Sequence, residues 1–381
     1  MALQTDKFQT TNKQDSLHNL KVYHQNVRGL KDKLNLLSNF FYSEFIHMIC
    51  LTEHHLKDHE INLVSMEHYK LIAKFYRQQY KNGGTCIFVH KSIDYDIIPT
   101  DHICKEKDLE ICAVKLNLHK INIVIISIYR SPSGNYSYFL KKLESFLKSS
   151  YTLRTEYIIC GDINVNYLHS NSRQQQLDML LTTYNLVSIV KFPTRITDQS
   201  STTIDNFFID PSWKHSIKPI ANGISDHDAQ IIVLENVLMP AHKLTPCVFR
   251  DFNDHSIHNF LMHLRMENWM MFFQEIMLSI IFNKFLDTCL KIFNTHFKQT
   301  KYHPLQKINP WITKGIRISC YNKRSLYLSC RNSNNEKLIN RYKTYSKTLL
   351  NVIKAAKKMY DDELISKSKN KIKDNMANHK E

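Results

Sequence analysis

The chain has 381 residues, more than the roughly 100–200 of an ordinary domain, so one large domain with a smaller appendage is expected. Its 43% hydrophobic content, 7 Gly, 9 Pro and nine Cys without a Cys-x-x-Cys pair argue against fibrous, low-complexity, disulfide-framework and structural-zinc proteins, and fit a reducing compartment. The formal net charge is +16, and residues 301–381 hold most of it, with 19 Lys/Arg against 6 Asp/Glu. A basic end favours a polyanionic partner, nucleic acid before a membrane surface, although a solvated helical face explains the charge equally well.

Two stretches bear on where the protein is found. Residues 1–19 are polar and lack the apolar segment of a secretion signal, so we expect a flexible N-terminal segment and a nuclear or cytoplasmic protein that is not secreted. The stretch from Trp269 to Leu286 comes closest to a membrane segment, but it carries Glu275 and Lys284. We therefore expect a buried helix there, no transmembrane segment and no membrane partner.

Short β-branched or aromatic runs alternate with helical stretches, which predicts an α/β domain over residues 20–238. Several runs, such as Ile121–Ile128, are apolar on both alternating sides, so layers should cover both faces of their sheets. The expected strands are Leu20–Gln25, His47–Thr52, Gly84–His90, Ile111–Leu116, Ile121–Tyr129, Tyr157–Cys160, Ile204–Ile209 and Ala229–Leu234. The expected helices include Leu30–Tyr42, Ser137–Leu147 and Arg173–Tyr184.

Helical pattern dominates after about residue 240, where the strand signals stop. Pro240 and Pro246 mark a linker over residues 239–254, and a basic helical region is expected over residues 255–375. From residue 338 apolar positions recur at alternating steps of four and three, which predicts one seam of a long helix. They are Leu338, Tyr342, Tyr345, Leu349, Val352, Ala356 and Met359. A helix docked on its neighbours, with its lysines in water, is favoured over a dedicated nucleic-acid helix.

Polar side chains follow two early strands. Asn26 comes after Leu20–Gln25 and offers a neutral oxygen ligand, although a turn residue before Arg28-Gly29 is the simpler interpretation. Glu53 directly follows His47–Thr52, and a carboxylate that leaves an apolar strand is a good ligand for a hard cation. A glutamate at a helix entry explains Glu53 equally well.

Two later strands also end in polar residues. Tyr129 ends the longest apolar run, where a phenol could hold a phosphate oxygen or simply be half-buried. Gly161-Asp162-Ile163-Asn164 follows Tyr157–Cys160. Asp162 and Asn164 are two positions apart, so in extended backbone they share a face. A carboxylate and an amide that converge in this way can polarise and orient a water, which makes this motif the more specific of the two.

Ser225-Asp226-His227 precedes the apolar run Ala229–Leu234. Asp226 can ligate a metal ion, and His227 can act as a general base or stabilise charge on a phosphate. Such a histidine needs an orienting carboxylate, and Asp205, the lone charge in its run, is the candidate. Other histidines are interpreted as structural: His54, His55, His90, His102 and His119.

Taken in order, these residues resemble the endonuclease/exonuclease/phosphatase (DNase I-like) superfamily, and within it the apurinic-type endonuclease of non-LTR (LINE-type) retrotransposons. The motifs that carry the resemblance are Gln25-Asn26, Thr52-Glu53, Tyr129, Gly161-Asp162-Ile163-Asn164, Pro193-Thr194-Arg195, Thr203-Ile204-Asp205 and Ser225-Asp226-His227. The segments Arg250-Asp251-Phe252, Trp269 and Asn309–Thr313 resemble the connector toward a reverse transcriptase, of which no motif is found. The resemblance implies a four-layer α/β sandwich, in which helices flank two packed β-sheets, followed by an α-helical C-terminal region.

The resemblance also implies an enzyme, a divalent-metal-dependent endonuclease that nicks DNA and leaves a 3′-hydroxyl. The cofactor would be Mg²⁺, with Mn²⁺ as the alternative, and the residues implied to hold or surround it are Asn26, Glu53 and Asp226. The residues implied to be catalytic are Tyr129, Asp162, Asn164, Asp205 and His227, with Asp162 and Asn164 activating water and Asp205 orienting His227. The residues implied to contact the phosphate are Asn26, Tyr129, Asn164, Arg195 and His227.

Two other functions stay open at this point. The first is a different enzyme of the same fold, a phosphatase of lipid headgroups or a poly(A) nuclease. The second is a non-catalytic nucleic-acid-binding remnant of a truncated retrotransposon. DNA is the expected partner, and RNA is a further candidate partner for the basic helical region.

Overall fold

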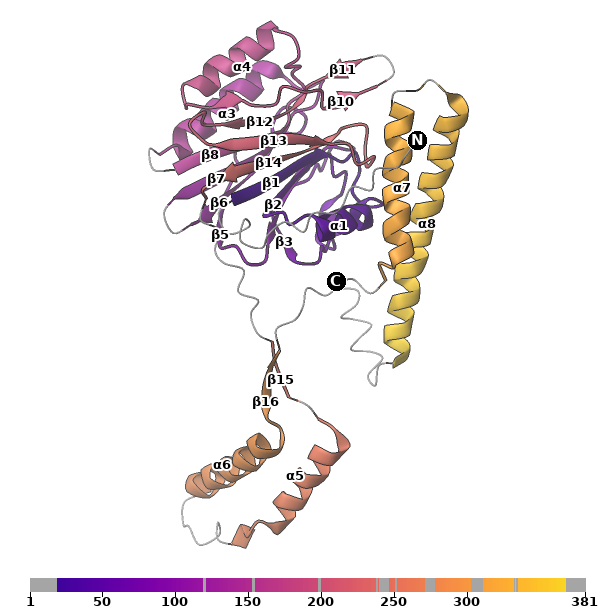
Figure 1. The fold of residues 1–381 in the computed structure, drawn as a ribbon. Coiled ribbons are helices and arrows are strands. Elements are labelled where there is room, and N and C mark those ends of the chain that lie inside the picture. Colours follow the sequence, from indigo (N-terminus) through magenta and orange to yellow (C-terminus); the bar gives the residue numbers. More distant parts are fainter. Residues whose placement is uncertain are drawn as a thin grey trace. The chain divides into compact units, whose positions relative to one another are not determined.

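The computed structural model, shown in Figure 1, describes residues 19–118, 121–152, 155–197, 200–237, 239, 247–250, 252–270, 278–302, 311–331, 333 and 335–367. Its contacts divide the chain into two compact units, one of residues 1–241 and 308–381 and the other of residues 242–307. All but the last residue of the predicted flexible segment 1–19 lies outside the described residues. The predicted domain limits at 238, 254 and 375 stay predictions, since these units are defined by contacts alone.

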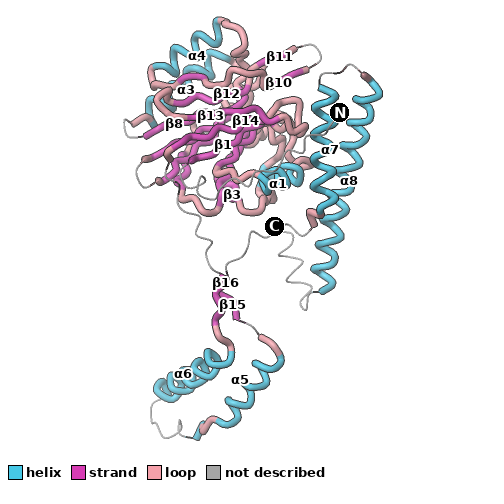
Figure 2. The backbone as a smooth tube through the Cα atoms, viewed as in Figure 1, coloured by secondary structure: helices cyan, strands magenta, loops and turns pink. Residues whose placement is uncertain are grey.

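Two six-stranded mixed sheets form the centre of the first unit (Figure 2). The first sheet has the order β13 (His215–Ile220), β14 (Ala229–Glu235), β1 (Asn19–Asn26), β2 (Met48–Thr52), β4 (Thr85–His90) and β3 (Tyr69–Phe75). The second has the order β5 (Tyr95–Ile98), β6 (Glu110–Asn117), β7 (Asn122–Tyr129), β8 (Thr155–Asp162), β12 (Asp205–Ile209) and β9 (Val187–Ser188). The pairs β1–β2 and β7–β8 are parallel and the others antiparallel. The strands β10 (Arg195–Ile196) and β11 (Ser201–Thr202) pair in a separate, two-stranded antiparallel ribbon.

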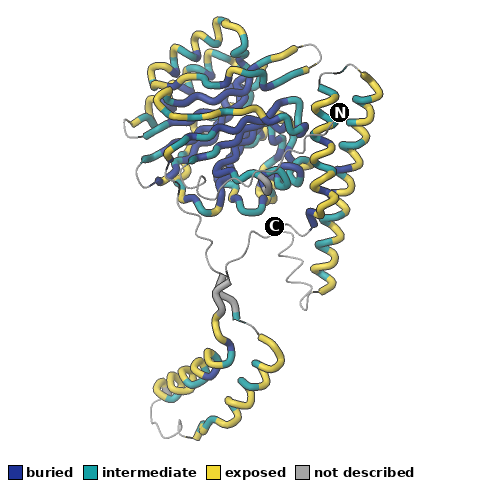
Figure 3. Tube along the Cα trace, viewed as in Figure 1, coloured by how far each residue is buried: buried dark blue, intermediate teal, exposed yellow. Residues whose placement is uncertain are grey.

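Along the central strands, successive side chains point to opposite faces of the sheet, and apolar side chains are buried on both faces. In β7, Ile123 and Ile125 face the core between the sheets, whereas Val124 and Ile126 face the cluster beneath α3 (Tyr136–Ser150) and α4 (Ser172–Thr182). On the outer side of the first sheet lie α1 (Leu34–Ser43), which buries Leu37, and the short α2 (Asp58–Ile61). Figure 3 shows the buried strands between more exposed helices. The expected two-sided burial and the predicted α/β sandwich are confirmed.

Asparagine side chains cap the N-termini of α3 and α4, the helices that cover the second sheet. Asn135 accepts the Tyr138 N–H before α3, and Asn171 accepts the Gln174 N–H before α4, each at 2.9 Å. The predicted start of the first helix at residue 30 is wrong. Residues 27–33 form turns that include Gly29 at φ +93°, so α1 begins at Leu34.

The C-terminal part of the first unit is a hairpin of α7 (Lys314–Arg331) and α8 (Glu336–Lys367). Leu349 and Ile353 of α8 are buried in the apolar cluster of the first sheet. The predicted seam is wrong at Val352 and Met359, which are 48% and 72% exposed. The buried stripe follows the 3.6-residue period of a straight helix instead of a heptad repeat, so it drifts away from the predicted positions.

The second unit pairs β15 (Cys247–Arg250) with β16 (Gln299–Tyr302) and adds α5 (Asp254–Met266) and α6 (Leu278–His296). The prediction that strands stop after about residue 240 is therefore wrong. The expected buried helix is also wrong where it is described, because Phe282 and Phe285 of α6 are 58% and 45% exposed. Among the helices with described positions, none has the length and apolar character to span a membrane.

Three buried histidines couple folding of the first unit to pH. Burial lowers the pKa of His24 to about 4, of His47 to about 3 and of His54 to about 4. These folded pKa values lie below the ordinary value of about 6.5, so the unfolded chain takes up protons first as the pH falls. Their contribution to stability is therefore complete above pH ~6.5 and is lost as the pH falls toward the folded values.

We expect the free energy of unfolding to drop by on the order of 2 kcal/mol per histidine between pH 7 and pH 5, as measured by urea unfolding at both pH values. His47→Asn is the matched variant, because asparagine does not titrate and its Oδ1, attached to Cγ like His47 Nδ1, can still accept the Lys21 N–H that lies 3.0 Å from that nitrogen. This variant should lose about a third of the histidine-linked drop. An identical pH dependence in the variant would contradict the assignment.

Candidate active site

Strand pairing brings the predicted site residues to one end of the two sheets. Asp162, the last residue of β8, pairs with Tyr129 of β7 on one side and with Asp205 of β12 on the other. Asn26 ends β1 opposite the last residue of β2, directly before Glu53. Residues far apart in the sequence thus meet where the buried strands of both sheets end.

Asn26 links the two sheets at this end. Its side-chain amide donates to Glu53 Oε1 at 2.9 Å and to Asp162 Oδ2 at 2.7 Å. Its Oδ1 accepts the Arg28 N–H at 3.1 Å, which fixes the orientation of the amide. Glu53 has a φ of +52°, a left-handed conformation that costs a non-glycine residue roughly 1–3 kcal/mol. The surrounding contacts therefore hold Glu53 in a strained turn, with its carboxylate against Asn26.

A histidine–aspartate pair lies beside Asp162. His227 Nδ1 is 2.7 Å from Asp205 Oδ2, and Thr194 Oγ1 donates to the same oxygen at 2.8 Å. One ligand atom from each of Asp162, Asp205 and His227 lies within 4.8 Å of the other two, and all three residues are buried. The carboxylate favours a proton on Nδ1, so Nε2 is the ring nitrogen that can act on a bound molecule. The structure thus brings Asp205 to His227 as an orienting group.

The buried carboxylates change one another's proton affinity. Burial raises the pKa of Asp162 to about 8, and the Asp205 charge adds to this rise. Burial by itself lowers the pKa of His227, but the neighbouring carboxylates, Asp205 first, outweigh it and raise the pKa to about 9. This end of the sheets therefore concentrates negative charge that a cation stabilises.

Asn164 is held by a turn and by Arg130. Because β8 ends at Asp162 and Asn164 has a φ of +51°, the prediction that the two share a face of an extended strand is wrong. The Asn164 N–H donates instead to Asp162 Oδ1 at 3.1 Å, a turn typical of aspartate. Asn164 Nδ2 donates to the Arg130 carbonyl at 2.8 Å, and the buried Arg130 guanidinium donates back to the Asn164 carbonyl at 3.0 Å. The two predicted residues converge through this turn.

Gly161 and Tyr129 show how tightly the motif is packed. Gly161 has a φ of +154°, and a Cβ at this position would lie 1.8 Å from the carbonyl oxygen of Ile128 in β7, so no larger residue fits. The Tyr129 hydroxyl lies near the Glu53 carboxylate, and each group shifts the pKa of the other. Burial, with the Glu53 charge, raises the pKa of Tyr129 well above its usual value. The hydroxyl therefore stays protonated and remains a donor.

Two arginines bind the Asp226 carboxylate. Arg28 Nη1 and Arg195 Nε donate to Asp226 Oδ2 at 2.8 Å and 2.9 Å. Burial opposes ionisation of Asp226, but the charges of His227 and Arg28 outweigh it and lower its pKa. The Arg28 and Arg195 side chains are 49% and 36% exposed, so both guanidinium groups reach solvent beside the site. This places Arg195, predicted to contact a phosphate, next to Asp226.

Oxygen donors for a hard cation gather around Glu53. Burial raises its pKa, but hydrogen bonds from His55 and Asn26 outweigh burial and lower it to about 2, so the carboxylate is ionised at neutral pH. Within the described residues the buried Asp205 Oδ1 has no hydrogen-bond partner. The ionised Glu53 carboxylate is an oxygen donor that suits Mg²⁺, and the Asn26 amide holds it in place through its nitrogen. The cluster with His227 mixes nitrogen and oxygen donors, and its ring nitrogen Nδ1 is already bound to Asp205. The carboxylate-rich site therefore fits a divalent cation.

Sequence reasoning missed four residues that complete the site: Arg28, His55, Arg130 and Thr194. His55, interpreted as structural, lies 3.0 Å from Glu53 Oε2 through its Nε2. Its place two positions after Glu53 was the available signal. Thr194 lies within the motif Pro193-Thr194-Arg195, which was part of the family resemblance. The sequence around Arg28 and Arg130 gave no signal for a role of either residue in the site.

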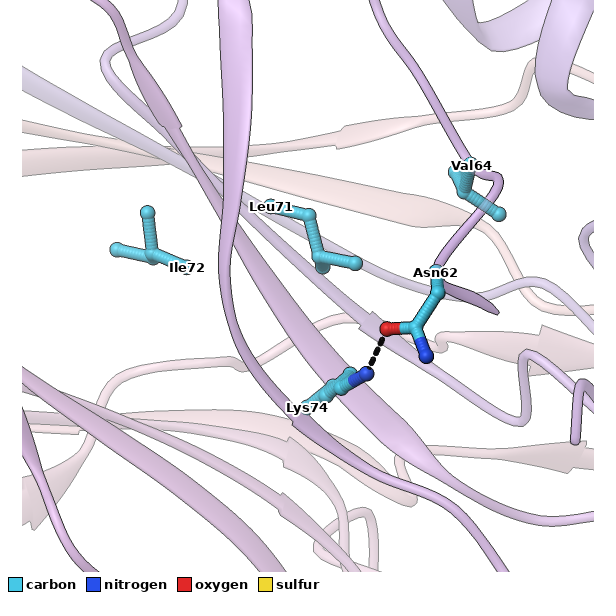
Figure 4. A pocket seen from close by; sticks show the side chains of 5 residues that line it. All are labelled: Asn62, Val64, Leu71, Ile72 and Lys74. Carbon is cyan, nitrogen blue, oxygen red and sulfur yellow. Dashed lines mark hydrogen bonds between the residues drawn. The ribbon is translucent and has the colours of Figure 1, made fainter. Parts of the chain in front are cut away.

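A cavity elsewhere in the first unit, shown in Figure 4, takes no part in this site. Its lining consists of Asn62, Val64, Leu71, Ile72 and Lys74, and Lys74 donates to the Asn62 side chain. None of these residues belongs to the candidate site. The candidate site therefore lies at the strand ends and is separate from this cavity.

Comparisons with known proteins bear on the class of this site. Residues 123–231, which span β7 to β14, match the family model described as endonuclease-reverse transcriptase. This match confirms, over that segment, the resemblance predicted from the order of the motifs. No curated protein matches the chain.

Solved structures similar to the chain include the endonuclease domain of TRAS1, a telomere-specific non-LTR retrotransposon. It is 15% identical and has a TM-score of 0.46, with 57% of this chain and 99% of that chain covered. An AP endonuclease from Archaeoglobus fulgidus is 15% identical, with a TM-score of 0.43 and coverage of 56% and 99%. The 3′-5′ exonuclease NExo from Neisseria meningitidis is 14% identical, with a TM-score of 0.44 and coverage of 57% and 100%.

Proposed function

We propose that the chain is a divalent-metal-dependent endonuclease that hydrolyses DNA phosphodiester bonds and leaves a 3′-hydroxyl. The observation that carries the proposal is the junction at Asn26, which bonds Glu53 and Asp162 while the Asp205–His227 pair lies alongside. A carboxylate for a hard cation, a carboxylate with high proton affinity and an oriented histidine are the groups that phosphodiester hydrolysis requires. The family match over residues 123–231 supports the same class of reaction.

In this proposal, different side chains of the protein activate the attacking water and bind the phosphate. Asp162 accepts a proton from the attacking water, and Asn164 orients that water. His227, charged at neutral pH because its pKa is about 9, donates from Nε2 to a phosphoryl oxygen. Tyr129 donates a further hydrogen bond to the phosphate. Bound Mg²⁺ or Mn²⁺, held by Glu53 with Asn26 and Asp226 around it, would neutralise phosphoryl charge and stabilise the leaving 3′-oxygen.

The direct test uses supercoiled plasmid, poly(A) and inositol phosphates as parallel substrates for the purified chain. We expect plasmid nicking in Mg²⁺ or Mn²⁺, loss of nicking in EDTA and little turnover of the other substrates. Faster turnover of poly(A) or inositol phosphates would replace the proposal with another enzyme of this fold. DNA binding that persists in EDTA, without cleavage in any divalent metal, would indicate a non-catalytic remnant. RNA binding by residues 255–375 and a nuclear location stay predictions.

Glu53→Gln should raise the Mg²⁺ concentration that gives half-maximal nicking by at least about tenfold, because it removes the ionised oxygen ligand but keeps the shape of the side chain. A Mg²⁺ titration of nicking measures the change. Glu144→Gln, at an exposed position on α3, is the matched control and should leave the titration unchanged. Equal Mg²⁺ dependence in Glu53→Gln and the wild-type chain would remove Glu53 from the metal site.

A further inference from the structure

Asp226 and His227 lie in the loop of residues 221–228. The carbonyl of Gly223 in this loop accepts hydrogen bonds from both helices of the α7–α8 hairpin. Lys323 Nζ of α7 donates to the Gly223 carbonyl at 3.2 Å, and the Tyr342 hydroxyl of α8 donates to the same oxygen at 3.1 Å. Gly223 has a φ of +66°, and a Cβ there would lie 3.1 Å from the Tyr342 oxygen and from the Tyr327 ring. Both helices thus pack directly on the backbone of the loop.

An ion pair fixes the other end of the same loop. Arg331, the last residue of α7, lies with its Nη1 2.7 Å from Asp228 Oδ2, and the two side chains are 19% and 5% exposed. Asp228 directly follows His227, and its N–H donates to the Thr194 carbonyl at 2.7 Å. Thr194 in turn bonds Asp205, the partner of His227. Breaking a pair this buried leaves an uncompensated charge one residue from the catalytic histidine.

The inner side of the loop is held by β1. Gln25 Nε2 donates to the His227 carbonyl at 2.9 Å and to Asn222 Oδ1 at 3.0 Å. The loop therefore lies between a strand of the first sheet and the helical hairpin, and the bonds on its outer side come from residues far along the chain.

The hairpin itself is anchored in the core. Trp311 and Ile316, with Leu349 and Ile353, belong to the same buried apolar cluster as Ile224 of the loop. Lys323 is only 6% exposed, and a carbonyl is a weak counterpart for a buried ammonium group. A hairpin that served only to cover apolar surface would gain nothing from placing a lysine there.

We propose that the α7–α8 hairpin is a positioning element that holds residues 221–228 in the geometry the reaction needs, with Lys323 and Arg331 as positioning residues. The proposal deepens the endonuclease function and rests on it for its activity readout. It makes residues 311–367 part of the working nuclease, beyond any connecting role.

The test compares Arg331→Gln, Arg331→Lys and Lys354→Gln in the full chain. Lys354 also links α8 to the body of the first unit, through an ion pair of 2.7 Å with Asp32, but that pair is 57% and 64% exposed and lies on residues outside the loop. We expect kcat for plasmid nicking to fall by about 10- to 100-fold in Arg331→Gln, as for a small misplacement of reacting groups, with KM within about twofold. Arg331→Lys should restore much of kcat, and Lys354→Gln should match the wild type.

Hydrogen exchange gives a readout that does not depend on catalysis. Amides of residues 221–228 should exchange faster in Arg331→Gln than in the wild type, and not in Lys354→Gln. Lys323→Met, which keeps the apolar stem but removes the donor, gives the same comparison if Arg331→Gln fails to fold. Unchanged exchange and unchanged kcat, or a rise in KM alone, would overturn the proposal. A wild-type chain that does not nick DNA would contradict the endonuclease function, while the exchange data would still decide whether the hairpin holds the loop.

Discussion

Asp162→Asn is expected to reduce plasmid nicking by about 10²–10⁴-fold while the protein stays folded. Asp162 has the raised proton affinity of a general base, with a pKa of about 8 that burial and the Asp205 charge produce. Asparagine keeps the shape of the side chain but cannot accept the proton. Because a pKa of about 8 leaves most Asp162 carboxyls protonated at neutral pH, the neutral asparagine should leave the thermal unfolding temperature nearly unchanged. Initial rates of nicking at saturating Mg²⁺ measure the effect.

Asp178→Asn is the matched control for this variant. Asp178 of α4 is partly buried, its pKa is likewise raised by burial, and its Oδ1 accepts the Tyr167 hydroxyl at 2.9 Å. It lies outside the site, so its variant should nick DNA at the wild-type rate. If Asp162→Asn kept more than about a tenth of the wild-type rate, Asp162 would not be the general base.

The second large effect is expected for His227→Ala, which should lower kcat by about 10²–10³-fold because a charged donor to the phosphate is lost. Asp205→Asn should give a smaller loss, since Asp205 acts through its 2.7 Å bond to His227 Nδ1. The double variant should be no slower than His227→Ala, because the two residues work as one unit. Losses that multiply would mean that Asp205 acts on the reaction independently of His227.

The buried strands were predictable because their sequence alone requires burial on two sides. β7, with Ile123, Val124, Ile125 and Ile126 in succession, has no polar face to leave in water. The unpredicted strands β3, β5 and β13 lie at or next to the sheet edges and have exposed positions. Pro219 in β13 further weakens the strand signal. The periodicity that reveals a central strand is therefore missing where one side of the strand meets solvent.

Residues of the candidate site that end a strand could be predicted, since a polar residue after an apolar run is conspicuous. Asp162 and Glu53 were found in this way, whereas Asp226 and His227 were found because they come just before an apolar run. The partners that hold the site could not be predicted, because they lie far along the chain: Arg28 donates to Asp226 across 198 positions, and Arg331 of α7 forms an ion pair with Asp228. Such contacts depend on packing and not on local pattern. The left-handed conformation of Asn164 could not be predicted either, so the prediction that Asp162 and Asn164 share a face of an extended strand was wrong.

The measurement that tests the central claim most directly is the chemistry of the nicked ends. Supercoiled plasmid is incubated with the full chain in Mg²⁺, repurified and offered to a DNA polymerase with labelled nucleotides, without prior phosphatase treatment. Hydrolysis with the 3′-oxygen as leaving group predicts nicks that the polymerase extends at once, and none when EDTA is present. Nicks that require phosphatase before extension, or an intact plasmid in every divalent metal, would contradict the endonuclease mechanism built on Glu53, Asp162 and His227.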